Sequence, residues 1–163
     1  MNHKLALASL LLALSSTVAC GGDDGGGGGD YSAADIEAAA PSGTIEGTAW
    51  TMAAALVRLE DDGELSVELS GTAQTEACPF LLEGDSPGVL FSVAGAAGEY
   101  PLHFTSFTDA QTVTMFVPPA QNFIATSGMI VVSNLTATEV TIGLVADADT
   151  SVVNGTFTTT LCE

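Results

Sequence analysis

From Gly43 onward, apolar and polar residues alternate along most of the chain, and this alternation restricts the fold more than any other feature. The clearest case is ELSVELS, in which Leu65, Val67 and Leu69 alternate with serine and glutamate. Successive side chains of a strand point to opposite faces, so such a segment predicts a strand with one buried and one solvated face. The same pattern occurs in residues 99–104, 112–117, 139–147 and 155–161.

Turn-forming residues separate these segments. Residues 61–63 (DDG) predict a hairpin turn, residues 95–98 (GAAG) divide two strands, and residues 118–119 (PP) end a third. Asn154-Gly155 is the strongest short hairpin signal in the chain. Together the segments predict eight or nine strands, spaced about 10 to 15 residues apart. We therefore expect an all-β domain over residues 43–163, an antiparallel β-sandwich or a small barrel.

The first 19 residues have the layout of a secretory signal peptide. Lys4 gives a short positive region, residues 5–14 are leucine and alanine interrupted only by Ser9, and small or β-branched residues follow. A helix of about ten residues spans about 15 Å, half of a hydrocarbon core of about 30 Å, which argues against a transmembrane anchor. We expect residues 1–19 to be removed on export.

Cys20 follows this leader directly. The stretch Thr17-Val18-Ala19-Cys20 resembles the lipobox of bacterial lipoproteins, with Thr17 where that family most often has leucine. The resemblance implies that a diacylglyceryl group is attached to the Cys20 thiol and anchors the protein to the membrane. Gly21 replaces the aspartate that signals inner-membrane retention, which implies an exported protein of the bacterial cell envelope at the outer membrane. The alternative is ordinary cleavage after Ala19, with Cys20 free or disulfide-bonded.

Residues 20–42 form a linker in this interpretation. Its first part, CGGDDGGGGGD, is rich in glycine and aspartate, and such a chain is expected to be a flexible, disordered tether. Residues 31–42 could form a short helix, with Ser32 and Asp35 as a capping box. The part that follows resembles small all-β domains of uncharacterised bacterial lipoproteins and no characterised family.

The chain has three cysteines, an odd number for an exported protein. Lipid on Cys20 would leave Cys78 and Cys162 as a pair in an oxidising compartment, and we expect a disulfide between them. Closure of a loop of about 85 residues contributes about 4.6 kcal/mol in the chain-entropy model. Two separate buried thiols are the alternative. A metal site is disfavoured, because neither cysteine has a C-x-x-C partner or a nearby histidine.

The exported part is strongly acidic. Once Lys4 is removed with the leader, Arg58 is the one lysine or arginine left beside 20 carboxylates, a formal charge of −19. This charge excludes nucleic acid as a partner, since nothing neutralises phosphates, and disfavours adsorption on anionic lipid. It favours solubility and leaves divalent cations or cationic partners as ligand classes.

No sequence motif identifies an enzyme. His103 is the single histidine after the leader, and a Ser–His–Asp site would need it as the base with Ser92 or Ser106 nearby. We expect His103 to be exposed, opposite a face shared by Tyr100, Leu102 and Phe104, and Pro101 to mark an edge strand. No G-x-S-x-G motif occurs. Residues 149–151 (DTS) lack the glycine of an aspartic protease loop, so a polar turn is favoured there.

Residues 60–64 and 147–149 are carboxylate clusters, and Ca²⁺ prefers such oxygen ligands. The second cluster fails the EF-hand template, so solvated turns are the favoured interpretation of both, and no metal or other cofactor is predicted. Trp50 could stack on a sugar if exposed, but Met52 lies on its face and favours a core position. Sequons at Asn134 and Asn154 are discounted, because a lipobox implies a bacterium.

These patterns predict a lipid-anchored protein of the cell envelope that is not an enzyme and acts as a structural or binding module. They name no ligand. Two alternatives stay open: a Ca²⁺-assisted carbohydrate-binding module, and an envelope hydrolase built on His103 or on paired acids.

Overall fold

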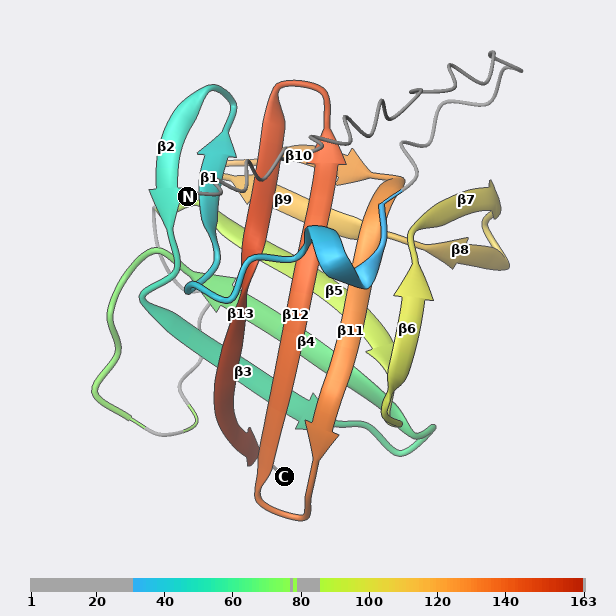
Figure 1. The fold of residues 1–163 in the computed structure, drawn as a ribbon. Coiled ribbons are helices and arrows are strands. Elements are labelled where there is room, and N and C mark those ends of the chain that lie inside the picture. Colours follow the sequence, from blue (N-terminus) through green and yellow to red (C-terminus); the bar gives the residue numbers. More distant parts are fainter. Residues whose placement is uncertain (1–30, 77, 79–85, 163) are drawn as a thin grey trace, which may run out of the picture.

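The computed structural model describes residues 31–76, 78 and 86–162, and strands dominate this part of the chain (Figure 1). The all-β prediction is confirmed. The elements are the 3₁₀ helix η1 (Ala33–Asp35) and the strands β1 (Ser42–Ile45), β2 (Thr48–Thr51), β3 (Ala54–Leu59), β4 (Glu64–Ser70), β5 (Gly88–Ala94), β6 (Gly98–Pro101), β7 (His103–Ser106), β8 (Asp109–Gln111), β9 (Val113–Val117), β10 (Gln121–Ala125), β11 (Ser127–Leu135), β12 (Glu139–Ala148) and β13 (Ser151–Cys162). The described part thus holds more strands than the eight or nine predicted, because short ones such as β2 and β8 carry no clear alternation. Within it, no helix has the length and apolarity to span a bilayer.

The strands form two layers that pack face to face as a β-sandwich (Figure 1). Layer A contains, in order, β2, β1, β13, β12, β11 and β6, and layer B contains β3, β4, β5, β9 and β10. The two layers are joined by β13, whose end pairs parallel to β3 through Leu161 with Val57 and Cys162 with Arg58. All other printed pairings are antiparallel, and β7 and β8 form a small separate sheet.

The core lies between the layers, and inward-facing side chains of both layers fill it. Leu65, Val67 and Leu69 of β4 are all buried, as the alternation predicts. The alternation over residues 112–117 is confirmed in the same way. In residues 139–147 the predicted inward set is buried, but Gly143 and Val145 on the opposite face are buried as well, so that face is not solvated throughout. Trp50 is also buried, and its indole N–H donates to the Pro87 carbonyl at 3.1 Å, which confirms its core position. Burial of each large aliphatic side chain contributes about 1.5–3 kcal/mol.

The predicted hairpin at Asn154-Gly155 is wrong. β13 runs through both residues without interruption, and the turn from β12 lies at residues 149–150, where Asp149 takes the left-handed conformation with φ 58°. Gly155 is required for a different reason. A Cβ built on it would lie 2.5 Å from the Cα of Pro41 and 2.7 Å from the carbonyl oxygen of Ala39, so glycine permits a close approach of two backbones.

The shared face predicted for Tyr100, Leu102 and Phe104 is also wrong. β6 is an edge strand, as Pro101 indicates, but it ends at that proline. Leu102 is buried and its amide donates to the Gly128 carbonyl at 2.9 Å. The chain then leaves the sandwich as β7, so Phe104 is exposed. The alternation predicted over residues 99–104 is lost because strand β6 ends at Pro101.

Residues 31–41, which we call the N-terminal strap, cross the outer face of layer A (Figure 1). η1 is shorter than a two-turn helix, but the expected capping box of Ser32 and Asp35 is present. The Asn154 side chain donates to the Asp35 carbonyl and accepts the Glu37 amide, both at 2.9 Å. These residues lie in the segment predicted to be a linker, and they are held on the sheet by direct hydrogen bonds. Residues 20–30 lie outside the described residues.

The predicted disulfide is present between Cys78 and Cys162, with the Cα atoms 5.9 Å apart. Cys162 and Leu56 are both buried and pack together against Ala54, outside the main core. The bond therefore fastens the loop after β4 to the last described residue of β13, beside the parallel pairing that joins the layers.

Removal of the strap contacts should destabilise the fold. We expect Asn154→Ala to lower the free energy of unfolding by about 1–3 kcal/mol, because it leaves two backbone groups of the strap without partners. Gly155→Ala should cost about 1–3 kcal/mol through overpacking against the strap backbone. Urea unfolding of the mature chain measures both. Asn122→Ala, at an exposed position of β10, is the matched control. Equal free energies of unfolding for all three variants would contradict a stabilising role of the strap contacts.

Candidate functional site

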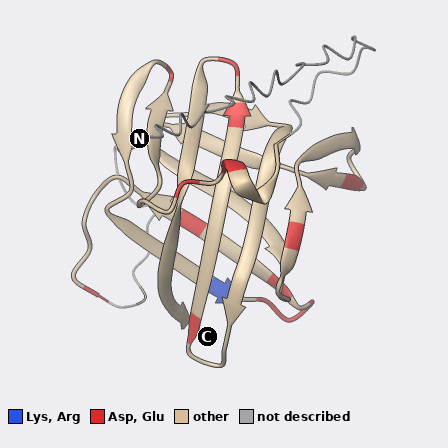
Figure 2. Ribbon diagram, viewed as in Figure 1, with Lys and Arg blue, Asp and Glu red and all other residues tan. Residues whose placement is uncertain are grey.

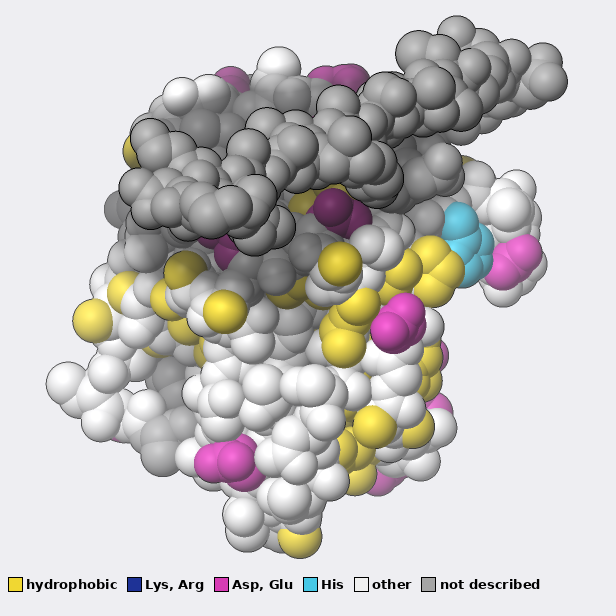
Figure 3. Space-filling view, in the orientation of Figure 1, with side chains coloured by type: hydrophobic (Ala, Val, Ile, Leu, Met, Phe, Trp, Pro, Cys, Tyr) yellow, Lys and Arg dark blue, Asp and Glu magenta, His cyan; other side chains and the backbone are white. Residues whose placement is uncertain are grey.

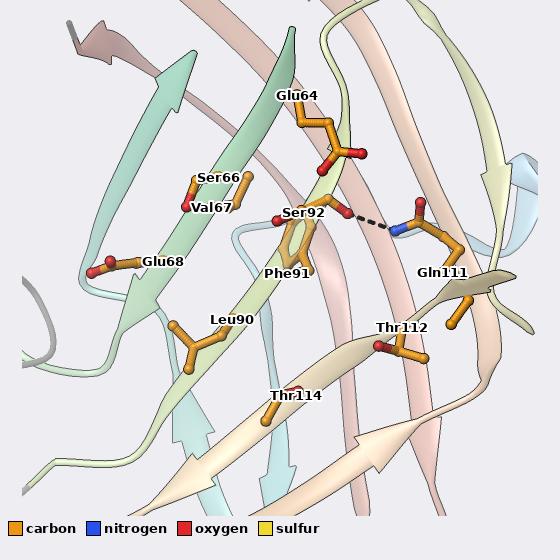
Figure 4. A pocket seen from close by; sticks show the side chains of 11 residues that line it. Glu64, Ser66, Val67, Glu68, Leu90, Phe91, Ser92, Gln111, Thr112 and Thr114 are labelled. Carbon is orange, nitrogen blue, oxygen red and sulfur yellow. Dashed lines mark hydrogen bonds between the residues drawn. The ribbon is translucent and has the colours of Figure 1, made fainter. Parts of the chain in front are cut away.

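A groove of about 470 Å³ lies on the outer face of layer B (Figure 4). Its floor is formed by the outward-facing residues of β4, β5 and β9, and one side is bounded by the end of β8. The lining residues with outward or rim positions are Glu64, Ser66, Glu68, Leu90, Ser92, Gln111, Thr112 and Thr114. The alternation that buries the leucines and valine of β4 therefore also places its hydroxyl and carboxylate groups in the groove.

The polar groups of the groove are spread along it and are not paired. Glu64 and Glu68 lie four residues apart on one strand, about 13 Å at the usual rise, and Figure 4 shows their carboxylates pointing away from each other. Oε2 of Glu68 is shielded from solvent and has no hydrogen-bond partner among the described residues. Gln111 donates to the Ser92 carbonyl at 2.6 Å and so fixes the end of β8 against β5.

This lining can bind but does not assemble a catalytic pair. Carboxylates, hydroxyls and an amide supply acceptors and donors for a polar ligand, and Leu90 adds one apolar contact. A glycosidase needs two carboxyl groups about 5–9.5 Å apart that face one bond. Glu64 and Glu68 do not meet that requirement in their observed orientation.

His103 is partly exposed on β7, with 44% of its side chain accessible; it is not one of the lining residues, but it pairs across the hairpin with Gln111 of the groove. Its Nδ1 lies 3.1 Å from the Pro101 carbonyl and its Nε2 lies 3.2 Å from Oδ1 of Asp109. These two partners, the Pro101 carbonyl first, raise the pKa of His103 above 6.5. Hydrogen bonds from Thr105 and then from His103 lower the pKa of Asp109. Ser106 bonds to Thr108, so the serine–histidine contact of a hydrolase is absent from this described hairpin.

The first carboxylate cluster surrounds the turn before β4, as predicted, whereas in the second only Asp149 lies in the turn, because Asp147 and Ala148 are the last residues of β12. Asp147 accepts the Tyr31 hydroxyl at 2.9 Å and the Asp149 amide at 3.1 Å, and the first of these bonds is the main cause of the raised pKa of Tyr31. Asp62 accepts the Glu64 amide in the other turn. Within residues 31–76, 78 and 86–162, no group of three histidine, cysteine or acidic side chains could hold a metal ion.

Acidic residues are scattered over both layers and their turns, with the single basic residue of the described part on β3 (Figure 2). Of the groove residues, sequence reasoning named Glu64, within a carboxylate cluster, and Ser92, as a triad candidate, but it did not predict the groove. The alternation predicts that Ser66 and Glu68 face outward, but it does not predict that β4, β5 and β9 lie side by side. Cys20 lies outside the described residues, so its lipidation stays a prediction. In comparisons with known proteins, the chain matches no family model, no curated sequence and no solved structure.

The pair of His103 and Asp109 should titrate as a unit. We expect the pKa of His103, measured by NMR, to exceed 6.5 in the folded protein and to fall in Asp109→Asn. Because the folded-state pKa is raised, the contribution of this pair to hairpin stability is present below the unfolded pKa and is lost as the pH rises through the folded pKa. Asp62→Asn is the control that should leave the titration unchanged. An Asp109→Asn titration identical to wild type would contradict the pairing.

Proposed function

We propose that this chain is a lipid-anchored protein of the bacterial cell envelope, exported to the outer membrane, and that its β-sandwich is a non-enzymatic structural or binding module.

 The anchor rests on the leader and on the lipobox-like stretch before Cys20. The binding role rests on the groove of layer B. The partner of the module in the envelope would be a protein or a glycan.

The polar groove is the observation that carries the binding role. Its walls come from strands of a rigid sheet, so the groove exists before any ligand arrives and no ordering cost is added on binding. Oε2 of Glu68 is buried there without a partner among the described residues. A buried carboxylate oxygen is normally hydrogen-bonded. A ligand that binds the Glu68 carboxylate must therefore displace the groups that shield this oxygen.

A glycan is the second, more specific candidate for the ligand. Sugar hydroxyls are bound by carboxylate, amide and hydroxyl side chains, which are the groups of Glu64, Glu68, Gln111 and Thr114 in the groove. This arrangement favours the carbohydrate-binding alternative over the hydrolase, because His103 lies outside the groove lining and the two glutamates point apart. Calcium would have to be held jointly by the groove and the glycan, since Ca²⁺ takes six to eight oxygen ligands.

The anchor is tested by expressing the full gene in a bacterial host. We expect the wild-type protein to partition into the detergent phase and Cys20→Ala to partition into water, because loss of the acyl chains removes the membrane attachment. Mass spectrometry of the mature N-terminus should show lipid on Cys20. Ser9→Ala, within the apolar run, is the control and should behave as wild type. Equal partitioning of wild type and Cys20→Ala would contradict lipidation.

The groove is tested with a tetrasaccharide of N-acetylglucosamine as a probe for envelope glycans, with and without millimolar CaCl₂. We expect saturable NMR shifts in β4, β5 and β9, and about tenfold weaker binding by Glu68→Gln, since loss of one charged hydrogen bond costs about 1.5–3 kcal/mol. Glu99→Gln, at an exposed position of β6, is the matched control. Shifts outside the groove, or none with and without calcium, would contradict the glycan candidate.

A further inference from the structure

The β7–β8 hairpin projects from the sandwich as a sheet of its own (Figure 1). Its base is fixed at two points, by the Leu102 amide on the Gly128 carbonyl and by Gln111 on Ser92. Towards the turn, Thr105 donates to both the carbonyl and the carboxylate of Asp109. An isolated two-stranded hairpin is marginally stable in water, so these bonds matter for holding its shape.

Two phenylalanines of this hairpin face solvent. Phe107, in the turn, is 97% exposed and Phe104 is 49% exposed, and their rings meet edge to face with centroids 5.4 Å apart. In the space-filling view, hydrophobic side chains adjoin the hairpin beside the histidine (Figure 3). A turn is normally built from polar residues and glycine, so an aromatic pair there is unfavourable in water and points to contact with an apolar phase.

The hairpin lies at the end of layer A where the described chain begins. The Tyr31 hydroxyl bonds to Asp147, and Asp147 pairs across the sheet with Ser127. The next residue of β11, Gly128, accepts the amide of Leu102 at the base of the hairpin. Tyr31 and the two phenylalanines therefore belong to one end of the molecule, and the chain leads from that end toward Cys20.

We propose that the β7–β8 hairpin is a membrane-contact element, whose Phe104 and Phe107 enter the interface of the bilayer that holds the lipid on Cys20. This inference rests on the proposed lipid anchor. Ten residues lie between Cys20 and Tyr31, and even a fully extended chain over these eleven steps spans only about 40 Å. The anchor keeps the hairpin near the surface, so a contact that is weak by itself gains from a high effective concentration.

The chemistry of the hairpin favours uncharged lipid over a charged surface. It carries no lysine or arginine, and Asp109, Asp147 and Asp149 lie on or near this end. Anionic headgroups would repel these carboxylates, whereas aromatic rings gain from burial at the boundary of headgroups and acyl chains. The occupant is therefore the bilayer itself, reached through zwitterionic headgroups.

The test uses the acylated full-length protein in phosphatidylcholine vesicles with brominated acyl chains, which quench nearby indoles. Phe107→Trp places a reporter in the hairpin turn, and Leu59→Trp places one at the far end of β3, at another exposed position. Trp50 is buried and supplies the same background in both variants. We expect strong quenching and a blue shift for the Phe107→Trp reporter, and no quenching by the brominated chains for the Leu59→Trp reporter. Phe104→Ser should reduce the quenching of the Phe107→Trp reporter.

The outcomes distinguish a failure of the proposed membrane contact from a failure of the proposed lipid anchor. A protein that carries lipid on Cys20 by mass spectrometry, but whose Phe107→Trp reporter is quenched no more than Leu59→Trp, overturns the membrane contact and leaves the anchor standing. Absence of lipid on Cys20 overturns both. All three substituted side chains are about half exposed or more, so we expect folding to be preserved, and unchanged urea unfolding checks this.

Discussion

The pairing of β13 holds the structure together. Its first part pairs with β1 and with β12 in layer A, and its end pairs with β3 in layer B. One strand thus supplies the hydrogen bonds through which the two layers become a single curled sheet. The disulfide to Cys78 is placed at that end, where two pairs of described residues join β13 to β3. A covalent bond therefore reinforces the place where the ladder between the layers is shortest.

The N-terminal strap depends on the same strand. Asn154 and Thr156 of β13 bond to its backbone, and Gly155 lets that backbone come close. Gly143 of β12 makes similar room for the Ile36 side chain. The glycines of these strands weaken the strands locally but create the surface on which residues 31–41 lie. The outer face of layer A is thus covered by chain from the same protein, while the outer face of layer B carries the open groove.

The local sequence pattern was enough to predict the fold class, but it was not enough to predict which strands lie side by side. The burial of Leu65, Val67 and Leu69 follows from a period of two. The disulfide was predicted from the odd number of cysteines and an expected oxidising compartment, with Cys20 assigned to the lipid. Asn154-Gly155 was predicted as a turn because its dipeptide favours one, yet tertiary contact with Pro41 explains the glycine. The groove needs the order of β4, β5 and β9, which no local signal contains. The exposure of Phe104 could not be predicted because residues 99–104 look like one continuous strand.

The pairings of β13 with strands far before it in the sequence also set the order in which the described part can fold. Ser42 pairs with Asn154, and Val57 pairs with Leu161, so the two layers cannot join before residues 151–162 are available. A chain that emerges N-terminus first, from a ribosome or across a membrane, therefore cannot join its layers until β13 has emerged. Such long-range pairings slow premature folding, because the cost of closing a long loop comes before the contacts that repay it. This late joining of the layers is compatible with the export proposed above, which requires an unfolded chain during passage.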